Sequence, residues 1–113
     1  MTITHRLRAI RSAVALSAEL SRPESRQAEE STNILNLSGS GALLESNRTY
    51  REGDVVFLRF SLPGMKQVEA EARVARVAGS EVGVTFERLE DRTTEMIVRH
   101  VVQEDRRRFA RAV

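Results

Sequence analysis

The chain has 113 residues, the length of a single domain, and 41% of them are hydrophobic while only 4% are aromatic. It has no cysteine, which excludes disulfides and thiolate metal sites, and no apolar run near the roughly 20 residues of a membrane-spanning helix. The 18 basic and 16 acidic residues leave a net charge of only +2, which disfavours non-specific DNA binding. We therefore expect a cytoplasmic protein with an aliphatic core, no membrane span and no DNA partner.

Six apolar runs separated by turn-forming residues predict six β-strands, at 12–20, 32–37, 42–46, 55–62, 68–78 and 82–86. Residues 12–20 and 68–78 alternate between apolar and polar side chains, as strands do when one face lies in a core. The β-branched and aromatic run 55–62 has the character of a well-buried strand, and 78–81 that of a hairpin turn. Strands this closely spaced indicate an antiparallel sheet that closes into a small barrel.

The pattern changes after residue 89 to helical spacing. Asp91 is expected to cap a helix whose apolar stripe contains Met96, Ile97, Val101 and Val102. Phe109 and Val113 continue that stripe, so self-association through this helix is a hypothesis, and the arginines at 106–108 could face solvent or a protein partner. The expected single domain consists of an arm, a barrel and a helix, at 1–11, 12–89 and 90–113.

The chemistry-bearing residues favour binding over catalysis. Lys66 is the only lysine, so nearly all of the cations are guanidinium groups, which suit planar, bidentate contacts. The sequence has no GxSxG elbow, no HExxH and no P-loop, and His5 and His100 are far apart along the chain. We therefore expect neither an enzyme nor a metal site or cofactor.

The segment 36–44 is the most distinctive part of the sequence. Alternation predicts that Asn36 and Ser38 point outward while the leucines on either side of Asn36 point inward. Gly39 and Gly41 then permit backbone angles that are closed to other residues, so that exposed N–H groups can approach a ligand. The alternative is a tight turn in which the Asn and Ser side chains satisfy the local backbone.

The motif N-x-S-x-x-G from Asn36 to Gly41, followed by A-L-L-E-S, resembles the second signature of the PilZ domain family, D/N-x-S-x-x-G. The stretch R-E-G-D-V-V-F-L-R-F-S-L-P-G resembles the next strand of that family and its turn. A-R-V-A-R-V and V-G-V-T-F resemble the paired strands that close its barrel, and the helix from Asp91 matches its C-terminal helix. The resemblance covers residues 6–105. It implies a mainly β fold, a small six-stranded antiparallel β-barrel with a C-terminal α-helix.

The resemblance also implies a binding module for the bacterial second messenger cyclic di-GMP. The first signature of the family is R-x-x-x-R on an arm ahead of the first strand, where Arg11 matches the second arginine. Leu7 stands at the position of the first arginine, and Arg6 and Arg8 flank it. Arginine can fork onto phosphate and bond the O6/N7 edge of guanine, so these groups suit a doubly anionic guanine ligand. The implied ligand-binding residues are Arg6, Arg8, Arg11, Asn36, Ser38 and Gly41.

A second R-x-x-x-R runs from Arg22 to Arg26, but too few residues separate it from Asn36 to fit a strand, its turn and the next strand. We interpret these two arginines as loop residues. The favoured function is a cyclic di-GMP sensor that relays the signal to a protein partner. A nucleotide-independent adaptor with the same barrel remains open, as does an RNA-binding barrel, although the scarce aromatic residues disfavour the latter.

Overall fold

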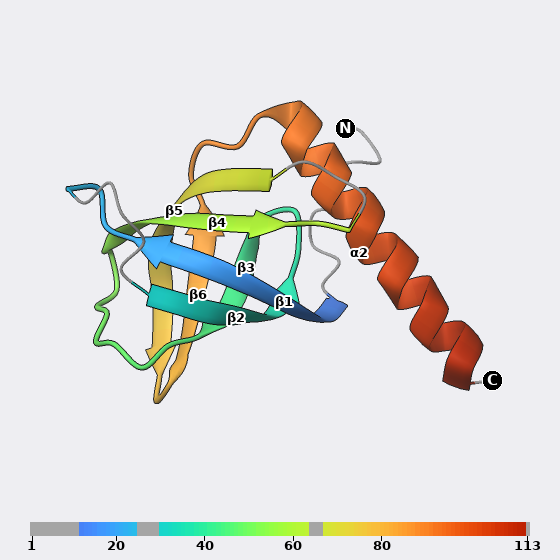
Figure 1. Cartoon of the computed structure of the whole chain (residues 1–113), viewed down its shortest axis with the longest axis horizontal. Helices are drawn as coiled ribbons and strands as arrows, with labels where there is room; N and C mark the ends of the chain where they lie inside the picture. The colour runs from blue at the N-terminus through green and yellow to red at the C-terminus, as the bar shows by residue number, and fades with distance from the viewer. Residues whose placement is uncertain (1–11, 25–29, 64–66, 113) are drawn as a thin grey trace.

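Six strands and one helix make up the described part of the chain in the computed structural model, which covers residues 12–24, 30–63 and 67–112. In chain order they are β1 (Ser12–Ser21), β2 (Glu30–Leu37), β3 (Gly41–Glu45), β4 (Val55–Ser61), β5 (Gln67–Ala78), β6 (Glu81–Phe86) and α2 (Asp91–Ala112) (Figure 1). The predicted arm, with Arg6, Arg8 and Arg11, lies outside the described residues, as does Arg26.

The six strands form a closed barrel in the order β1-β2-β3-β6-β5-β4, and every neighbouring pair is antiparallel. The barrel closes where β4 returns to β1, with Ala18 opposite Phe60 and Leu20 opposite Leu58. The prediction of a six-stranded antiparallel barrel followed by a C-terminal helix is confirmed. The hairpin turn between β5 and β6 is also confirmed, and Gly79 within it has a φ of +61°.

The barrel interior is aliphatic, as the composition predicted. Its most deeply buried side chains include Leu20, Ile34, Leu37, Leu44, Leu58, Phe60, Val74 and Val82. Strand β4, predicted to be well buried, is buried on its inner face. Val56, Leu58 and Phe60 point inward, but Phe57 is 39% exposed and Arg59 is also exposed. The outer face of a barrel made of one sheet is exposed to solvent, so residues along its strands alternate between buried and exposed positions.

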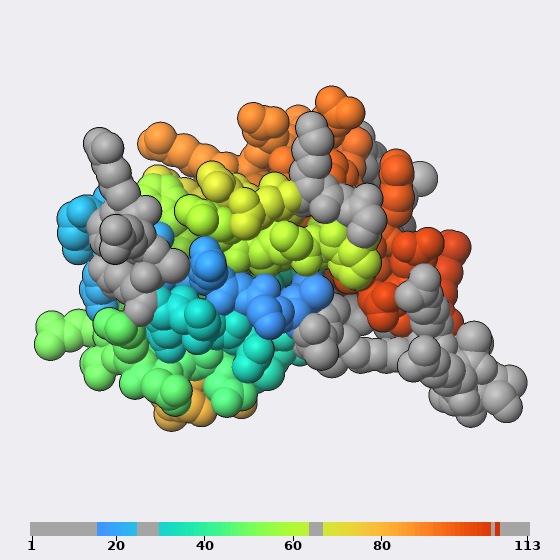
Figure 2. Space-filling model, viewed as in Figure 1, coloured from blue at the N-terminus to red at the C-terminus, as the bar shows by residue number. Residues whose placement is uncertain are grey.

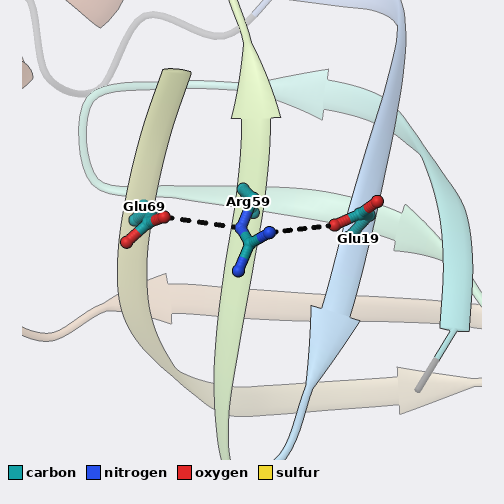
Figure 3. Close-up of polar contacts among 3 residues, drawn as sticks. All are labelled: Glu19, Arg59 and Glu69. Atoms are coloured by element: carbon teal, nitrogen blue, oxygen red, sulfur yellow. Dashed lines mark hydrogen bonds and ion pairs between the residues drawn. The ribbon is translucent and has the colours of Figure 1, made fainter. Parts of the chain in front are cut away.

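The outer face of β1, β4 and β5 carries a row of opposite charges. Arg59 lies between Glu19 and Glu69, with one nitrogen–oxygen distance of 3.4 Å to each (Figure 3). The pairs join three adjacent strands, and β1 and β4 lie side by side on the face shown in Figure 2. Because all three side chains are about half exposed or more, solvent weakens these pairs, and each contributes little to stability.

A denser polar cluster fixes the start of β2 to the connection between β3 and β4. The Glu30 carboxylate accepts hydrogen bonds from the Ser46 hydroxyl at 2.8 Å, the Asn47 N–H at 3.0 Å and the Tyr50 hydroxyl at 3.1 Å. The Arg22 guanidinium lies over the Tyr50 ring, 5.2 Å from its centroid. We call these five residues the Glu30 cluster.

Three register shifts interrupt the regular pairing of the barrel strands, one in β1 between Ala13 and Leu16 and one bulge each in β2 and β5. Leu35 is an extra residue in β2 between Ile34 and Asn36, and Ala75 is an extra residue in β5. The prediction that Leu35 points into the core is therefore wrong. It is half-buried, and the inward positions on either side of the bulge belong to Ile34 and Leu37. A bulge reverses the alternation after it, so it changes which side chains face outward.

Helix α2 has its cap one residue before the predicted one. The Thr94 N–H donates to the Glu90 carbonyl oxygen at 2.9 Å, so Glu90 rather than Asp91 takes the cap position. Asp91 lies in the first turn, where a carboxylate interacts favourably with the positive end of the helix dipole.

The helix packs against β1 and then projects beyond the barrel (Figure 1). Its buried apolar residues are Ile97, Val98 and Val101. Met96 and Val102, which the spacing also placed in the stripe, are half-buried. Within the described residues, no helix is long and apolar enough to cross a membrane.

Candidate functional site

A groove with a volume of about 360 Å³ lies across β2, β3, β6 and β5. Its walls come from the two outer strands of this group and its floor from the two inner ones. Among its lining residues the polar ones are Asn36, Ser38, Ser40, Arg76 and Thr85. The residue types of the D/N-x-S-x-x-G motif are therefore gathered in a concave site of the size that small ligands use.

One row of residues crosses the groove from wall to wall. Asn36 on β2 is opposite Leu43 on β3, Leu43 is opposite Gly83 on β6, and Gly83 is opposite Arg76 on β5. With strands about 4.8 Å apart, the backbones of Asn36 and Arg76 are about 14 Å apart along the sheet. Of the two middle residues, Gly83 has no side chain, which leaves space next to Arg76, while the half-buried Leu43 side chain lies on the floor next to Asn36.

The two bulges turn the wall residues outward. In a regular strand, inward Ile34 would put Asn36 inward as well, and inward Val74 would do the same to Arg76. The extra residues Leu35 and Ala75 reverse both orientations. Bulges often re-aim side chains beside binding sites, and here one lies on each wall of the same groove.

Asn36, which lines the groove, has an unsatisfied acceptor. Its Oδ1 atom is buried and has no hydrogen-bond partner among the described residues. A buried polar atom without a partner costs about 1–3 kcal/mol, and such atoms are rare in folded proteins. Asn36 lines the groove, so a small rotation of its side chain that exposes Oδ1 would let this atom accept a hydrogen bond from an N–H donor placed there.

Ser38, by contrast, holds the turn between β2 and β3. It is only 2% exposed, and its N–H donates to the Gly41 carbonyl oxygen at 2.9 Å. Its Oγ accepts from the Ser40 N–H and the Gly41 N–H, both at 3.2 Å. The expectation that Ser38 points outward is thus wrong. The alternative of a tight turn whose side chains bond the local backbone therefore describes Ser38. It does not describe Asn36, because no local backbone group donates to its side-chain oxygen.

The conformational reason given for the two glycines of the motif is also wrong. Among the described residues only Gly53 and Gly79 have a positive φ, so the turn at 39–41 needs no left-handed residue. Gly41 is required for a different reason. A Cβ built there would overlap the carbonyl oxygen of Val84 on the neighbouring strand β6. Gly41 thus lets β3 and β6 approach closely along the floor of the groove.

The start of β1 lies beside the motif. Ser12 is opposite Leu37 and Ala13 is opposite Asn36, so β1 begins at the edge of the β2 wall. Arg11 directly precedes Ser12 in the sequence and lies outside the described residues. Arg22 lies elsewhere, in the Glu30 cluster, and does not line the groove.

Sequence reasoning missed the wall formed by β5, above all Arg76. A signal for it was present. Arg73 and Arg76 are three residues apart, so a regular strand would point one of them into the core. Since an unpaired charge is not buried in an aliphatic core, the spacing indicates either a bulge between them or a strand end that is exposed on both faces.

The fold agrees with the outcome of comparing the chain with known proteins. The family model of the PilZ domain matches residues 5–103, which is most of the chain. The chain belongs to the PilZ domain family. No curated protein matches it at a significant level.

Solved structures show the same fold at low sequence identity. The inhibitor of motility MotI/DgrA from Bacillus subtilis is 17% identical with a TM-score of 0.74, and the match covers 85% of this chain and 49% of the Bacillus chain. The PilZ domain of CeSA from a cellulose-synthesizing bacterium is 15% identical with a TM-score of 0.66, covering 84% of this chain and 97% of that one. An uncharacterized Legionella protein is 19% identical with a TM-score of 0.55, covering 87% and 97%.

Proposed function

We propose that this PilZ domain is a non-enzymatic cyclic di-GMP sensor of the bacterial cytoplasm that binds its ligand in the groove and relays the signal to a protein partner. The buried, unsatisfied Oδ1 of Asn36 carries the proposal. A guanine base presents N1–H and N2–H₂ donors that match this acceptor. The only charged side chain among the described lining residues is Arg76, so the groove is suited to an anionic ligand.

The size of the groove supports a division of the ligand between barrel and arm. A volume of about 360 Å³ is near the lower end for small-molecule sites and suits one nucleotide half of a cyclic dinucleotide. The arm precedes Ser12, which lies beside the motif. Arg6, Arg8 and Arg11 would then contact the phosphates and the rest of the ligand. Ser38 would hold the turn beside the groove, with its hydroxyl donating to the Gly41 carbonyl oxygen at 3.4 Å, and Gly41 would keep β3 and β6 close along the floor.

A nucleotide-independent adaptor is the second candidate, and Leu7 is the observation that favours it. Because leucine stands at the first arginine position of R-x-x-x-R, the arm has only one of the two arginines of that signature at the matching positions. The adaptor would keep the barrel and the projecting helix and use them for protein contacts alone. It predicts no response to the nucleotide.

Calorimetric titration with cyclic di-GMP separates the two functions. For the sensor we expect saturable binding by the wild-type chain. Arg11→Ala should lower the affinity at least tenfold, because a charge-assisted hydrogen bond contributes about 1.5–3 kcal/mol. Asn36→Val should also weaken binding, without loss of stability, since it removes an unsatisfied buried atom.

The matched control for this titration is Arg22→Ala, which removes a guanidinium outside the groove and should leave the affinity unchanged. Absence of heat and of any thermal shift with the wild-type chain would favour the adaptor. Equal effects of the Arg11 and Arg22 variants would contradict the assignment of the arm.

A further inference from the structure

Arg76 differs from the other arginines on the described strands. Arg59 lies between two glutamates, and Arg73 donates to the Glu87 carboxylate at 2.6 Å and to the Gly53 carbonyl oxygen at 2.9 Å. Within the described part of the chain, the Arg76 guanidinium has neither an ion-pair nor a hydrogen-bond partner. It is exposed, and the bulge at Ala75 turns it onto the groove wall. A stabilising role in the barrel therefore does not account for it.

We propose that Arg76 reads the O6/N7 edge of a guanine held in the groove and so sets the preference for guanine over adenine, an inference that rests on the proposed function. Guanine offers two acceptors on this edge, and the guanidinium fork binds both at once. Adenine has the N7 acceptor but presents an amino donor in place of O6, so Arg76 would face a donor. The discrimination is built from donor–acceptor complementarity rather than from charge.

The row across the groove gives the base a second contact from the opposite wall. Asn36 lies at the other end of the row that contains Arg76, and its free Oδ1 can accept from N1–H or N2–H₂ of the same guanine. Gly83 leaves room next to Arg76, and half-buried Leu43 offers an apolar surface to the plane of the base. An acceptor and a fork of donors would then read two different edges of one base.

Parallel titrations with cyclic di-GMP and its adenine analogue cyclic di-AMP test this inference. The wild-type chain should prefer cyclic di-GMP. Arg76→Ala should lower the cyclic di-GMP affinity roughly 5- to 150-fold, the discrimination expected of one bidentate base contact, and change that for cyclic di-AMP little. Arg76→Lys keeps the charge but not the fork, so it should not restore the preference. Circular dichroism should show both variants folded, because Arg76 is exposed and unpaired.

Arg59→Ala is the matched control, since it removes an exposed strand arginine outside the groove and should leave both affinities unchanged. An Arg76→Ala chain that binds cyclic di-GMP as the wild type does would overturn the inference and leave the proposed function intact. Equal losses for the two nucleotides, or full recovery with Arg76→Lys, would overturn it too, because either result describes a phosphate anchor. A wild-type chain that binds neither nucleotide would remove the proposed function and this inference together.

Discussion

Asn36 and Ser38 belong to one short motif but have different roles in the folded chain. Ser38 is committed to the turn through hydrogen bonds with the backbone of Ser40 and Gly41, whereas the Asn36 oxygen has no such partner among the described residues. The sequence placed both in the candidate site but could not separate these roles. Whether a polar side chain satisfies its own turn depends on distances of a few tenths of an ångström. Only the folded geometry supplies those.

Replacing either of two glycines in the groove by alanine should change the stability of the protein, but in opposite directions. Gly41→Ala forces a Cβ into the Val84 carbonyl oxygen, so it should destabilise the protein by about 1–3 kcal/mol. Gly83→Ala places a Cβ 3.8 Å from the Arg76 Cβ, an ordinary contact at a φ that alanine tolerates, and should be neutral or raise stability by up to about 1 kcal/mol. Urea unfolding of both variants measures this. Equal midpoints for the two would contradict the steric role of Gly41.

At the scale of elements, the strands were predictable and the bulges were not recognised. Alternation identified the inward residues of β5, Val68, Ala70, Ala72 and Val74, because each alternates with a polar neighbour. A bulge adds one residue and leaves the composition of a strand unchanged, so Leu35 looked like a core residue and Arg76 like an ordinary surface residue. The register that joins Asn36 to Arg76 depends on four strands pairing together, and no local pattern encodes it.

The Glu30 cluster should contribute more to stability than the exposed ion pairs of Arg59, and this difference gives a second prediction. Glu30→Ala should destabilise the barrel by about 2–3 kcal/mol, because it leaves the Ser46 and Tyr50 hydroxyls and the Asn47 N–H without their acceptor. Glu69→Ala, in the exposed row beside Arg59, should cost less than about 1 kcal/mol. Thermal unfolding compares the pair. If Glu69→Ala proved the more damaging change, the Glu30 cluster would not be the tie between β2 and the loop after β3.

At the scale of the whole molecule, the barrel and the helix share β1. This strand pairs with β2 on the groove side and with β4 where the barrel closes, and α2 packs against it. The predicted arm, residues 1–11, directly precedes this strand in the sequence. A ligand that draws the arm toward the groove would therefore act on the strand that supports the helix, and the projecting end of α2 is well placed to present the result to a partner (Figure 1).

The projecting helix leads to a third prediction. Because the helical spacing of apolar residues continues to Phe109 beyond the barrel, we expect the full chain to self-associate through this end. A chain that ends at Gln103 keeps the buried residues Ile97, Val98 and Val101 and should remain a folded monomer. Light scattering over a range of concentrations compares the two chains. Equal masses corresponding to one protomer would exclude association through this helix.

Closure of the barrel also limits how another protein can recognise it. Each of the six described strands has a neighbour on both sides, so the sheet presents no complete unpaired edge. A partner cannot join by extending the sheet through main-chain hydrogen bonds, as it does in β-augmentation. Its specificity must come from side chains on the outer barrel surface, the loops or the helix. The same lack of an open edge protects the domain from strand-to-strand aggregation, even though 41% of its residues are hydrophobic.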